Sequence, residues 1–161
     1  MRALADWERD PRAPIELRVH GIPAPQGSKT AYVRGTRPVL VEGGSKAGRA
    51  SHAAWRQAVA TAARDYQQTF NRPLLNEPTA LDVVFLLCKP KTTPKYRLWP
   101  TTKPDLDKLV RATLDALTGV LLRDDCLVVR VMAEKVYGDP PGARLALHPL
   151  GMEEQARRAV R

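Results

Sequence analysis

Hydrophobic and polar residues recur with clear periods along most of the chain, and these periods predict its elements. Residues 15–22, IELRVHGI, alternate apolar and polar side chains, which is typical of a half-buried strand. Residues 80–88, ALDVVFLLC, are apolar on both faces and predict a central strand. We expect another strand at 126–137 and a last one at 143–149, which pairs back as a hairpin after the GDPPG turn.

Two further segments have the 3.6-residue period of an amphipathic helix. The first is expected from about 52 to 70, with Ser51 as its N-cap. The second is expected to begin at Asp105 and to run to about Thr118, with Gly119 placed to end it. Both have an apolar stripe that we expect to face the core.

Segments rich in proline and glycine separate these elements. Residues 23–38 predict a loop or a short hairpin, and residues 42–50 predict a loop. Together the elements predict one α/β (α+β) domain over residues 15–150, with a small mixed sheet packed by two main helices. Residues 1–14 are expected to form a flexible tail, and residues 151–161 a tail or a short helix.

The charge of the chain points to a polyanionic partner. Its 161 residues include 26 Lys plus Arg against 17 Asp plus Glu, a formal charge of +9, which suits nucleic acid or an acidic membrane surface. No apolar run reaches the roughly 20 residues that span a bilayer, and the N-terminus lacks the apolar core of a signal peptide. Cys88 and Cys126 lie in apolar sequence and are expected to be buried thiols, so we expect a soluble cytoplasmic protein.

Against this positive charge, five aspartates crowd into residues 103–125, KPDLDKLVRATLDALTGVLLRDD. Asp105 and Asp107 fall at the start of the second helix, where capping and the helix dipole offer an alternative explanation. Asp124 and Asp125 precede the next strand, and a turn at LTGVLLR can bring them back beside the first pair. Converging carboxylates repel one another unless a cation neutralises them, and Mg²⁺ or Mn²⁺ bound to a phosphate suits such ligands.

The segment 89–103 is a long loop with five cations and no acids. Its cations can track phosphates while Tyr96 and Trp99 stack on unpaired bases; the alternative is a solvated loop whose Trp99 packs on the body. Asp115, two turns along the second helix, is expected to form a surface ion pair with Arg111. The candidate phosphate contacts are Lys29, Lys91, Lys95, Arg97, Lys103, Lys108 and Lys135.

The aspartate-rich segment 103–125 resembles the hallmark of the RusA family of Holliday junction resolvases. That hallmark is approximately KPDLDNLxKaxLDAL, a short spacer and then DD. The segments HGIPAPQGSK, WRQAVATAA and EKVYG are similar to other parts of that family's pattern, so the resemblance covers most of residues 15–148. It implies a homodimeric, Mg²⁺-dependent endonuclease that makes paired nicks in four-way DNA junctions, encoded by a bacterium or its phage.

By position, the resemblance implies a catalytic and metal-binding set of Asp105, Asp107, Arg111, Asp124 and Asp125, in which the aspartates hold the metal. The family's helix lysine falls on Arg111, and its asparagine falls on Lys108. Arginine keeps the charge, but a guanidinium does not release a proton near neutral pH. These departures leave open a catalytically weak or inactive protein that binds junctions on the same scaffold. A third reading is a basic protein that binds single strands through the 89–103 loop.

Overall fold

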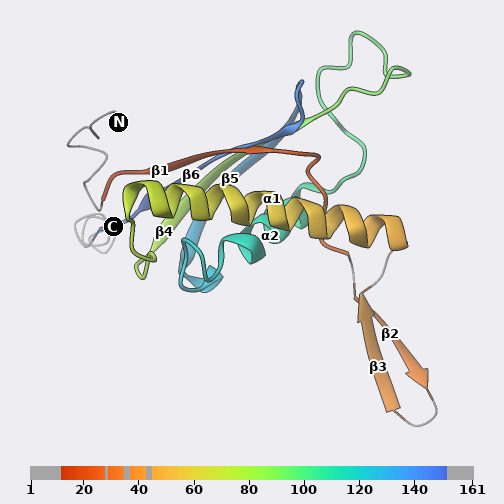
Figure 1. Cartoon of the computed structure of the whole chain (residues 1–161). Coiled ribbons are helices and arrows are strands. Elements are labelled where there is room, and N and C mark those ends of the chain that lie inside the picture. Colours follow the sequence, from red (N-terminus) through yellow and green to blue (C-terminus); the bar gives the residue numbers. More distant parts are fainter. Residues whose placement is uncertain (1–11, 28, 35–36, 43–44, 152–161) are drawn as a thin grey trace, which may run out of the picture.

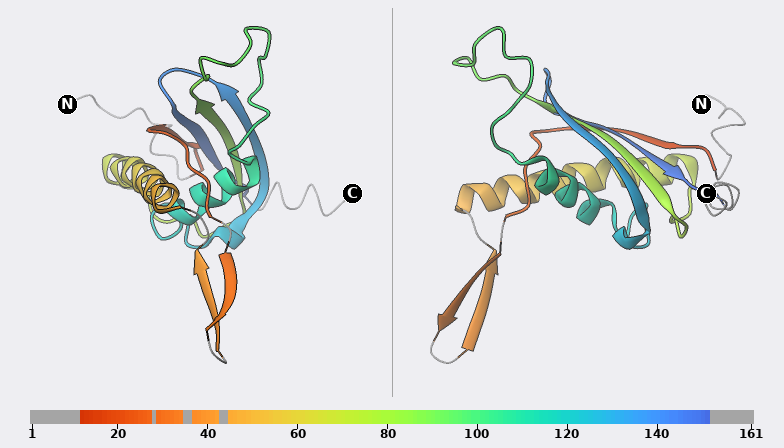
Figure 2. Two further views of the ribbon diagram at one scale, coloured as in Figure 1. Left: turned by 90° about the vertical axis from the view of Figure 1, so that its right-hand side faces the viewer. Right: turned by 180° about the vertical axis from the view of Figure 1, so that it is seen from behind.

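A sheet and two helices packed on one of its faces form the body of the protein (Figures 1 and 2). The computed structural model describes residues 12–151 except 28, 35–36 and 43–44, and it places side chains at 12–27 and 45–151. The expected terminal tails therefore lie almost entirely outside the described residues. Within those residues, no helix is long and apolar enough to cross a bilayer.

Four strands form the sheet in the order β1-β6-β4-β5. They are β1 (Ile15–His20), β4 (Thr79–Leu87), β5 (Val128–Tyr137) and β6 (Gly142–Pro149). Strand β4 is central, as its two apolar faces predicted; it pairs in parallel with β5 and antiparallel with β6. The predicted hairpin of the last two strands is wrong, because β6 lies on the other side of β4 and pairs with β1.

The chain steps over the end of β4 between β5 and β6, and two glycines make this step possible. The Gly138 amide donates to Leu87 O at 3.0 Å, and a Cβ on Gly138 would lie 2.5 Å from Leu86 Cδ2. A Cβ on Gly142 would overlap the carbonyl oxygen of Val19 on β1. Strand β6 can therefore enter between β1 and β4 only with glycine at its first position.

Helix α1 (Lys46–Phe70) begins six residues before its predicted start. Its N-cap is Ser45, whose Oγ accepts from the Gly48 amide at 3.1 Å. The predicted cap, Ser51, is an interior residue whose hydroxyl donates to Ala47 O at 3.0 Å. Glycines near the start of α1 had suggested a loop there, but the segment KAGRA contains only one of them, and its other residues are good helix formers.

Helix α2 (Leu106–Leu117) has the predicted bounds, with Asp105 at the N-cap and Thr118 at the C-cap. Both helices cover the same face of the sheet, and α1 also contacts α2 and β1 (Figure 2). The core between the layers includes Trp55 of α1, Phe85 of β4 and Leu109 of α2, each 1% exposed or less. Among the described residues, no helix covers the opposite face of the sheet (Figure 2).

Two segments project from the body at the end where α2 begins (Figures 1 and 2). One is the hairpin of β2 (Lys29–Arg34) and β3 (Arg37–Glu42), which is one of the two structures predicted for residues 23–38. The other is the loop between β4 and α2, residues 88–104. The start of α2 thus lies between two projecting arms.

The two cysteines are exposed, so the expectation of buried thiols is wrong. Cys88 directly follows the last residue of β4 at the rim of the sheet. Cys126 lies in a short 3-10 turn, η2 (Asp125–Leu127), before β5. Apolar neighbours in sequence did not bury these thiols, because both fall where a strand meets solvent.

Candidate active site and nucleic-acid interface

The first turn of α2 brings two carboxylates together in sequence and in space. Asp105 is the N-cap residue, but its side chain makes no capping hydrogen bond. Its carboxylate instead forms an ion pair with Lys108 Nζ at 3.0 Å. Asp107 is exposed, and within the described residues it has no hydrogen bond or ion pair. Neither carboxylate therefore makes a capping hydrogen bond, although Asp107, in the first turn of α2, lies where the helix dipole favours a negative charge.

Several ammonium groups surround Asp105. The hydrogen bond from Lys108 and then its charge lower the pKa of the Asp105 carboxyl, with smaller contributions from Lys103 and Lys135. Lys135 Nζ, on β5, donates to Thr102 O and Pro104 O, both at 2.8 Å. The start of α2 is thus fastened to β5 by Lys135. Lys135 is thus a structural tie; two of its three N–H donors are engaged, and its predicted phosphate contact stays a prediction.

Asp124 and Asp125 lie at the opposite end of β5 from Lys135. Asp124 Oδ1 accepts from the Cys126 amide at 2.9 Å, and this hydrogen bond lowers the pKa of the Asp124 carboxyl. A strand rises about 3.3 Å per residue, so Val128 and Lys135 are roughly 23 Å apart. Asp124 and Asp125 precede Val128 and are therefore far from the start of α2.

The structure does not bring the four aspartates together as the LTGVLLR turn had suggested. Within the described part of the chain, no three His, Cys, Asp or Glu side chains are close enough to hold a metal ion. The turn follows the last residue of α2 and bridges Leu122 to Leu75, just before β4. It therefore delivers Asp124 and Asp125 to the far end of α2, away from Asp105 and Asp107.

Arg111 and Asp115 of α2 do not form the ion pair that the sequence predicted. Arg111 is exposed, and it has no hydrogen bond or ion pair with the described residues. The predicted partner, Asp115, instead uses its backbone oxygen to accept from Arg56 Nη2 at 3.3 Å. The expected Arg111–Asp115 pair is therefore wrong. Arg111 lies four residues after Asp107, so both fall on the same side of α2.

The root of the β2–β3 hairpin lies against the first turn of α2. The Gln26 amide donates to Lys108 O at 3.2 Å, and Gln26 Oε1 is buried without a hydrogen-bond partner among the described residues. Sequence reasoning singled out the PAPQGSK segment but not this glutamine. Mg²⁺ is commonly bound by one or two carboxylates, with water and phosphate completing its shell. Asp105 and Asp107 supply the two carboxylates of that requirement.

The loop before α2 is held by one lysine. Lys89 Nζ donates to Lys95 O at 3.2 Å and to Arg97 O at 3.0 Å, and it lies 5.5 Å from the centroid of the Tyr137 ring. Among the loop cations, Lys89 thus has a structural role. Its contacts fold residues 89–97 back on themselves above the end of the sheet.

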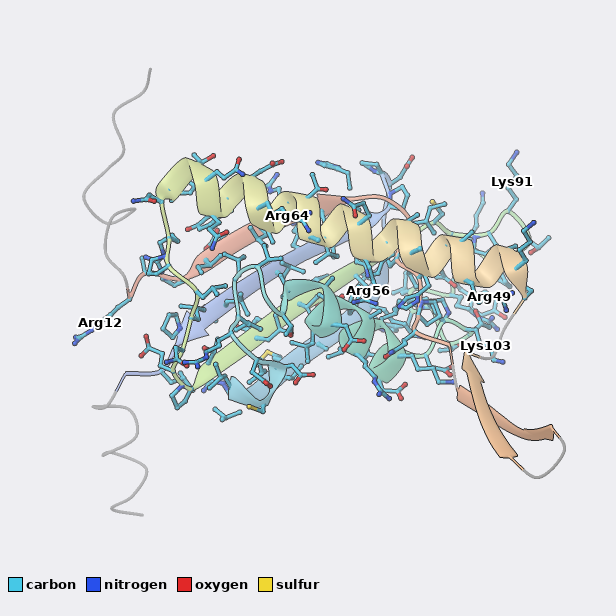
Figure 3. All side chains as sticks on the ribbon, turned by 60° about the horizontal axis from the view of Figure 1, so that its bottom comes forward. Arg12, Arg49, Arg56, Arg64, Lys91 and Lys103 are labelled. Atoms are coloured by element: carbon cyan, nitrogen blue, oxygen red, sulfur yellow. The ribbon has the colours of Figure 1, made fainter. Side chains whose placement is uncertain are left out.

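The loop presents its aromatic and apolar side chains to solvent. Tyr96 is 81% exposed, Leu98 73% and Trp99 59%, so the alternative that Trp99 packs on the body is wrong. The remaining predicted cations of the loop are also exposed; they are Lys91, Lys95, Arg97 and Lys103. The side chain of Lys29, on β2, lies outside the described residues. Figure 3 shows Lys91 and Lys103 at this end of the molecule and Arg49, Arg56 and Arg64 along α1.

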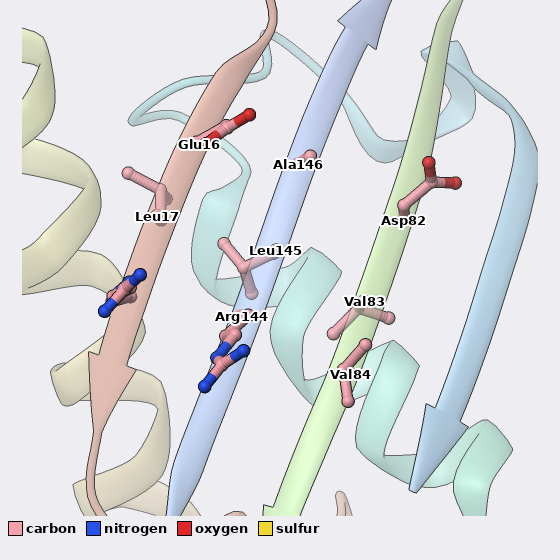
Figure 4. Close-up of a pocket in the computed structure, with 9 residues that line it drawn as sticks. Glu16, Leu17, Asp82, Val83, Val84, Arg144, Leu145 and Ala146 are labelled. Atoms are coloured by element: carbon pink, nitrogen blue, oxygen red, sulfur yellow. The ribbon is translucent and has the colours of Figure 1, made fainter.

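A second concave region lies on the face of the sheet that carries no helix (Figure 4). It measures about 510 Å³ and is lined by β1, β6 and β4, with Glu16, Asp82 and Arg144 at its surface. Its charges are of both signs, and Asp82 Oδ2 lies 3.1 Å from His148 Nε2. Nothing in this hollow gathers catalytic groups, so the start of α2 remains the candidate active site.

Comparison with known proteins gives two matches. The family model of Endodeoxyribonuclease RusA matches residues 25–148, a span from the root of the hairpin to the last strand. The chain is also similar to the uncharacterized protein YqaN of Bacillus subtilis (strain 168), at 26% identity over 137 residues, covering 79% of this chain and 90% of YqaN. The matched span includes both projecting arms and every candidate aspartate.

Proposed function

The chain belongs to the RusA endodeoxyribonuclease family, and from this premise we propose that it is a Mg²⁺-dependent endonuclease that resolves four-way DNA junctions by paired, symmetric nicks. The single observation that best supports the proposal is the carboxylate pair, Asp105 and Asp107, uncommitted to capping and placed between two projecting arms. Family membership alone supports a nuclease of the resolvase kind in bacteria or their phages. The metal dependence, the paired nicks and the cytoplasmic location of the protein in a bacterial cell are our proposal.

Asp105 and Asp107 are the residues that we propose to hold Mg²⁺, with Mn²⁺ as a substitute. When bound, the metal would supply an activated water and a positive charge for phosphodiester hydrolysis. Arg111, without a partner on the same side of α2, would bind the phosphate and stabilise its charge in the transition state. Lys108 neutralises Asp105 in the absence of metal, so its ammonium competes with the metal for that carboxylate.

Asp125, with Asp124 beside it, is the further proposed ligand. Because these two residues lie at the far end of β5, one chain cannot bring them to Asp105 and Asp107. A site built from both pairs therefore requires a second copy of the chain. This requirement supports the proposal of a homodimer, which also suits a substrate cut at two opposed strands.

The loop between β4 and α2 is the proposed contact to the junction centre. Tyr96 and Trp99 are exposed and would stack on unpaired bases, an interaction worth about 1–3 kcal/mol per base. The exposed loop cations would bind flanking phosphates, as would Lys29 on the hairpin. Lys103 lies two residues before Asp105, so DNA held by the loop would extend toward the carboxylates.

The test is incubation with a labelled synthetic four-way junction in Mg²⁺ or in EDTA. We expect symmetric, Mg²⁺-dependent nicks in the junction and none in a linear duplex of the same sequence. Asp107→Asn should abolish the nicks and leave junction binding unchanged, since Asp107 makes no contact that supports the fold. Loss of binding together with cleavage would contradict the metal role of Asp107.

A junction-binding protein with little or no activity is the second candidate, and the Asp105–Lys108 ion pair is the observation that favours it. Such a protein would bind junctions equally well with and without Mg²⁺ and leave them uncut. The variant Lys108→Asn with Arg111→Lys restores the family's residues at both positions. Cleavage by this variant but not by the natural chain would decide for the second candidate.

A further inference from the structure

Helix α1 carries a row of arginines along one of its flanks. Arg49, Arg56 and Arg64 are exposed and follow one another along the helix (Figure 3). At roughly 3.6 residues per turn, the three lie within about 80° of one another around the helix axis. The only acidic residue in the sequence of α1 is Asp65, which lines a depression on the flank that faces β1. The two flanks of α1 are therefore segregated by charge.

The three arginines lack the acidic neighbours that commonly balance a cation on a helix. No Asp or Glu lies three or four residues from any of them in the sequence. Arg56 and Arg64 form no ion pair with a described residue; Arg56 Nη2 donates only to the backbone oxygen of Asp115, at 3.3 Å. A solvated helix face usually alternates charges of both signs, so a row of one sign indicates a polyanionic partner.

A groove runs beside this row, between α1 and the end of α2. It measures about 360 Å³, and Arg56 and Arg64 line it together with Ala53 and Ala60, which lie on the same flank of α1. Asp115 is the single acid among the residues that line it. Because the side chains between the arginines are small, a phosphodiester backbone can approach the helix closely enough for the guanidinium groups to bind it.

The spacing of the row fits a duplex better than a single strand. From Arg49 to Arg64 the helix rises about 22 Å, the length of roughly six or seven base pairs. Arg56 and Arg64 are about 12 Å apart along the axis, which is comparable with the width of the major groove of B-DNA. The two side chains can therefore reach phosphates on both sides of that groove, whereas a single strand has no second backbone at a fixed distance.

The row starts at the end of the molecule where α2 begins. Arg49 lies at the same end as Lys103, which precedes Asp105 by two residues (Figure 3). We propose that a duplex arm of the four-way junction lies along α1, where Arg49, Arg56 and Arg64 bind its phosphates. This inference rests on the proposed function, because the start of α2 must meet the branch point. The arm is then held by a different helix from the one that carries the carboxylates.

The dependence of binding on salt tests the phosphate contacts. Affinity for a labelled four-way junction is measured in EDTA over a series of salt concentrations. Arg56→Gln with Arg64→Gln should reduce the slope of log affinity against log salt by about 1.8, because each lost phosphate contact contributes about 0.9. The matched control is Arg18→Gln with Arg144→Gln, which removes the same charge from the face of the sheet opposite the helices and should leave the slope unchanged.

Photo-cross-linking tests where the arm lies. In a Cys88→Ser, Cys126→Ser background, an aryl azide is attached to Ala53→Cys or to Gln68→Cys, two exposed positions on α1 that leave the arginines intact. Both should form adducts with the arms, and those from Gln68→Cys should lie roughly six or seven base pairs farther from the branch point. Glu16→Cys, on the opposite face of the sheet, should form none.

The outcomes separate this inference from the proposed function. An unchanged salt slope in the Arg56 and Arg64 variant, an equal fall in the control, or the absence of adducts from Gln68→Cys would each overturn the arm-binding role of α1. Adducts at the same distance from the branch point at both positions would also overturn it. Symmetric nicks in any of these cases would leave the proposed function standing. The expected slope and adducts without nicks would support the inference and contradict the nuclease.

Discussion

One ion pair controls the charge at the start of α2. Lys108 donates to Asp105, and this contact is the largest cause of the lowered pKa of that carboxyl. Asparagine at position 108, as in the family hallmark, would remove the charge and leave the carboxylate to other cations. Lys108, one of the two residues that depart from the family pattern, is therefore also the residue paired with a proposed metal ligand.

Replacing Lys108 by asparagine should raise the pKa of Asp105 toward its ordinary value of 3.8. The folded-state pKa is now below that of the unfolded chain, so the pair stabilises the fold above pH about 4 and ceases to do so as pH falls through the folded pKa. Lys108→Asn should reduce this acid sensitivity. Carboxyl ¹³C chemical shifts measured against pH check the shift.

Arg111→Gln is the control for this titration, because Arg111 is not among the causes of the Asp105 shift. It removes one positive charge from the same helix, as Lys108→Asn does. An equal rise of the Asp105 pKa in both variants would mean that general charge, and not the Lys108 hydrogen bond, lowers it.

Among the elements, the sequence predicted best those whose period is strong and local. Strands β1 and β4 and helix α2 appeared where expected, because the alternation of IELRVHGI and the leucine stripe after Asp105 are encoded within each segment. The start of α1 was missed because the sequence there, with a glycine in the first turn, resembles a loop. The N-cap contact is a single hydrogen bond to Ser45, which the structure reveals.

Two of the serines near the start of α1 provide a direct test of where that helix begins. Ser45→Ala should lower the free energy of unfolding by about 1 kcal/mol, because it removes the hydroxyl that accepts from the Gly48 amide. Ser51→Ala should be neutral or slightly stabilising, because Ser51 is inside the helix. Urea denaturation of the two variants makes the comparison, and the reverse order would place the cap at Ser51.

For the molecule as a whole, two features that the sequence did not predict are non-local. The place of β6 between β1 and β4 is set by pairing with two strands that are distant in sequence. The separation of Asp124 and Asp125 from the start of α2 depends on Leu122 bridging to Leu75.

Strand β6 lies between β1 and β4, and this strand order depends on glycine at position 142. Gly142→Ala should destabilise the protein by about 3 kcal/mol, because the new methyl group meets a backbone carbonyl of β1 that cannot move alone. Gly48→Ala, on exposed α1 and at an ordinary contact distance from Ser45 Oγ, should instead stabilise by about 0.5–1 kcal/mol. Thermal unfolding of both variants tests this; a tolerated Gly142→Ala would contradict the strand order.

The contrast between Trp55, which is 1% exposed, and Trp99, which is 59% exposed, has an optical consequence. An indole in a dry core emits at shorter wavelength than one in water, so emission collected at long wavelength favours Trp99 over Trp55. The chain has a third tryptophan, Trp7, so the measurement uses a Trp7→Phe variant. In that variant, stacking of Trp99 on a base would quench the long-wavelength emission and leave the core signal unchanged. The protein thus carries an intrinsic reporter in the loop proposed to meet the junction, and binding can be followed in real time without a label.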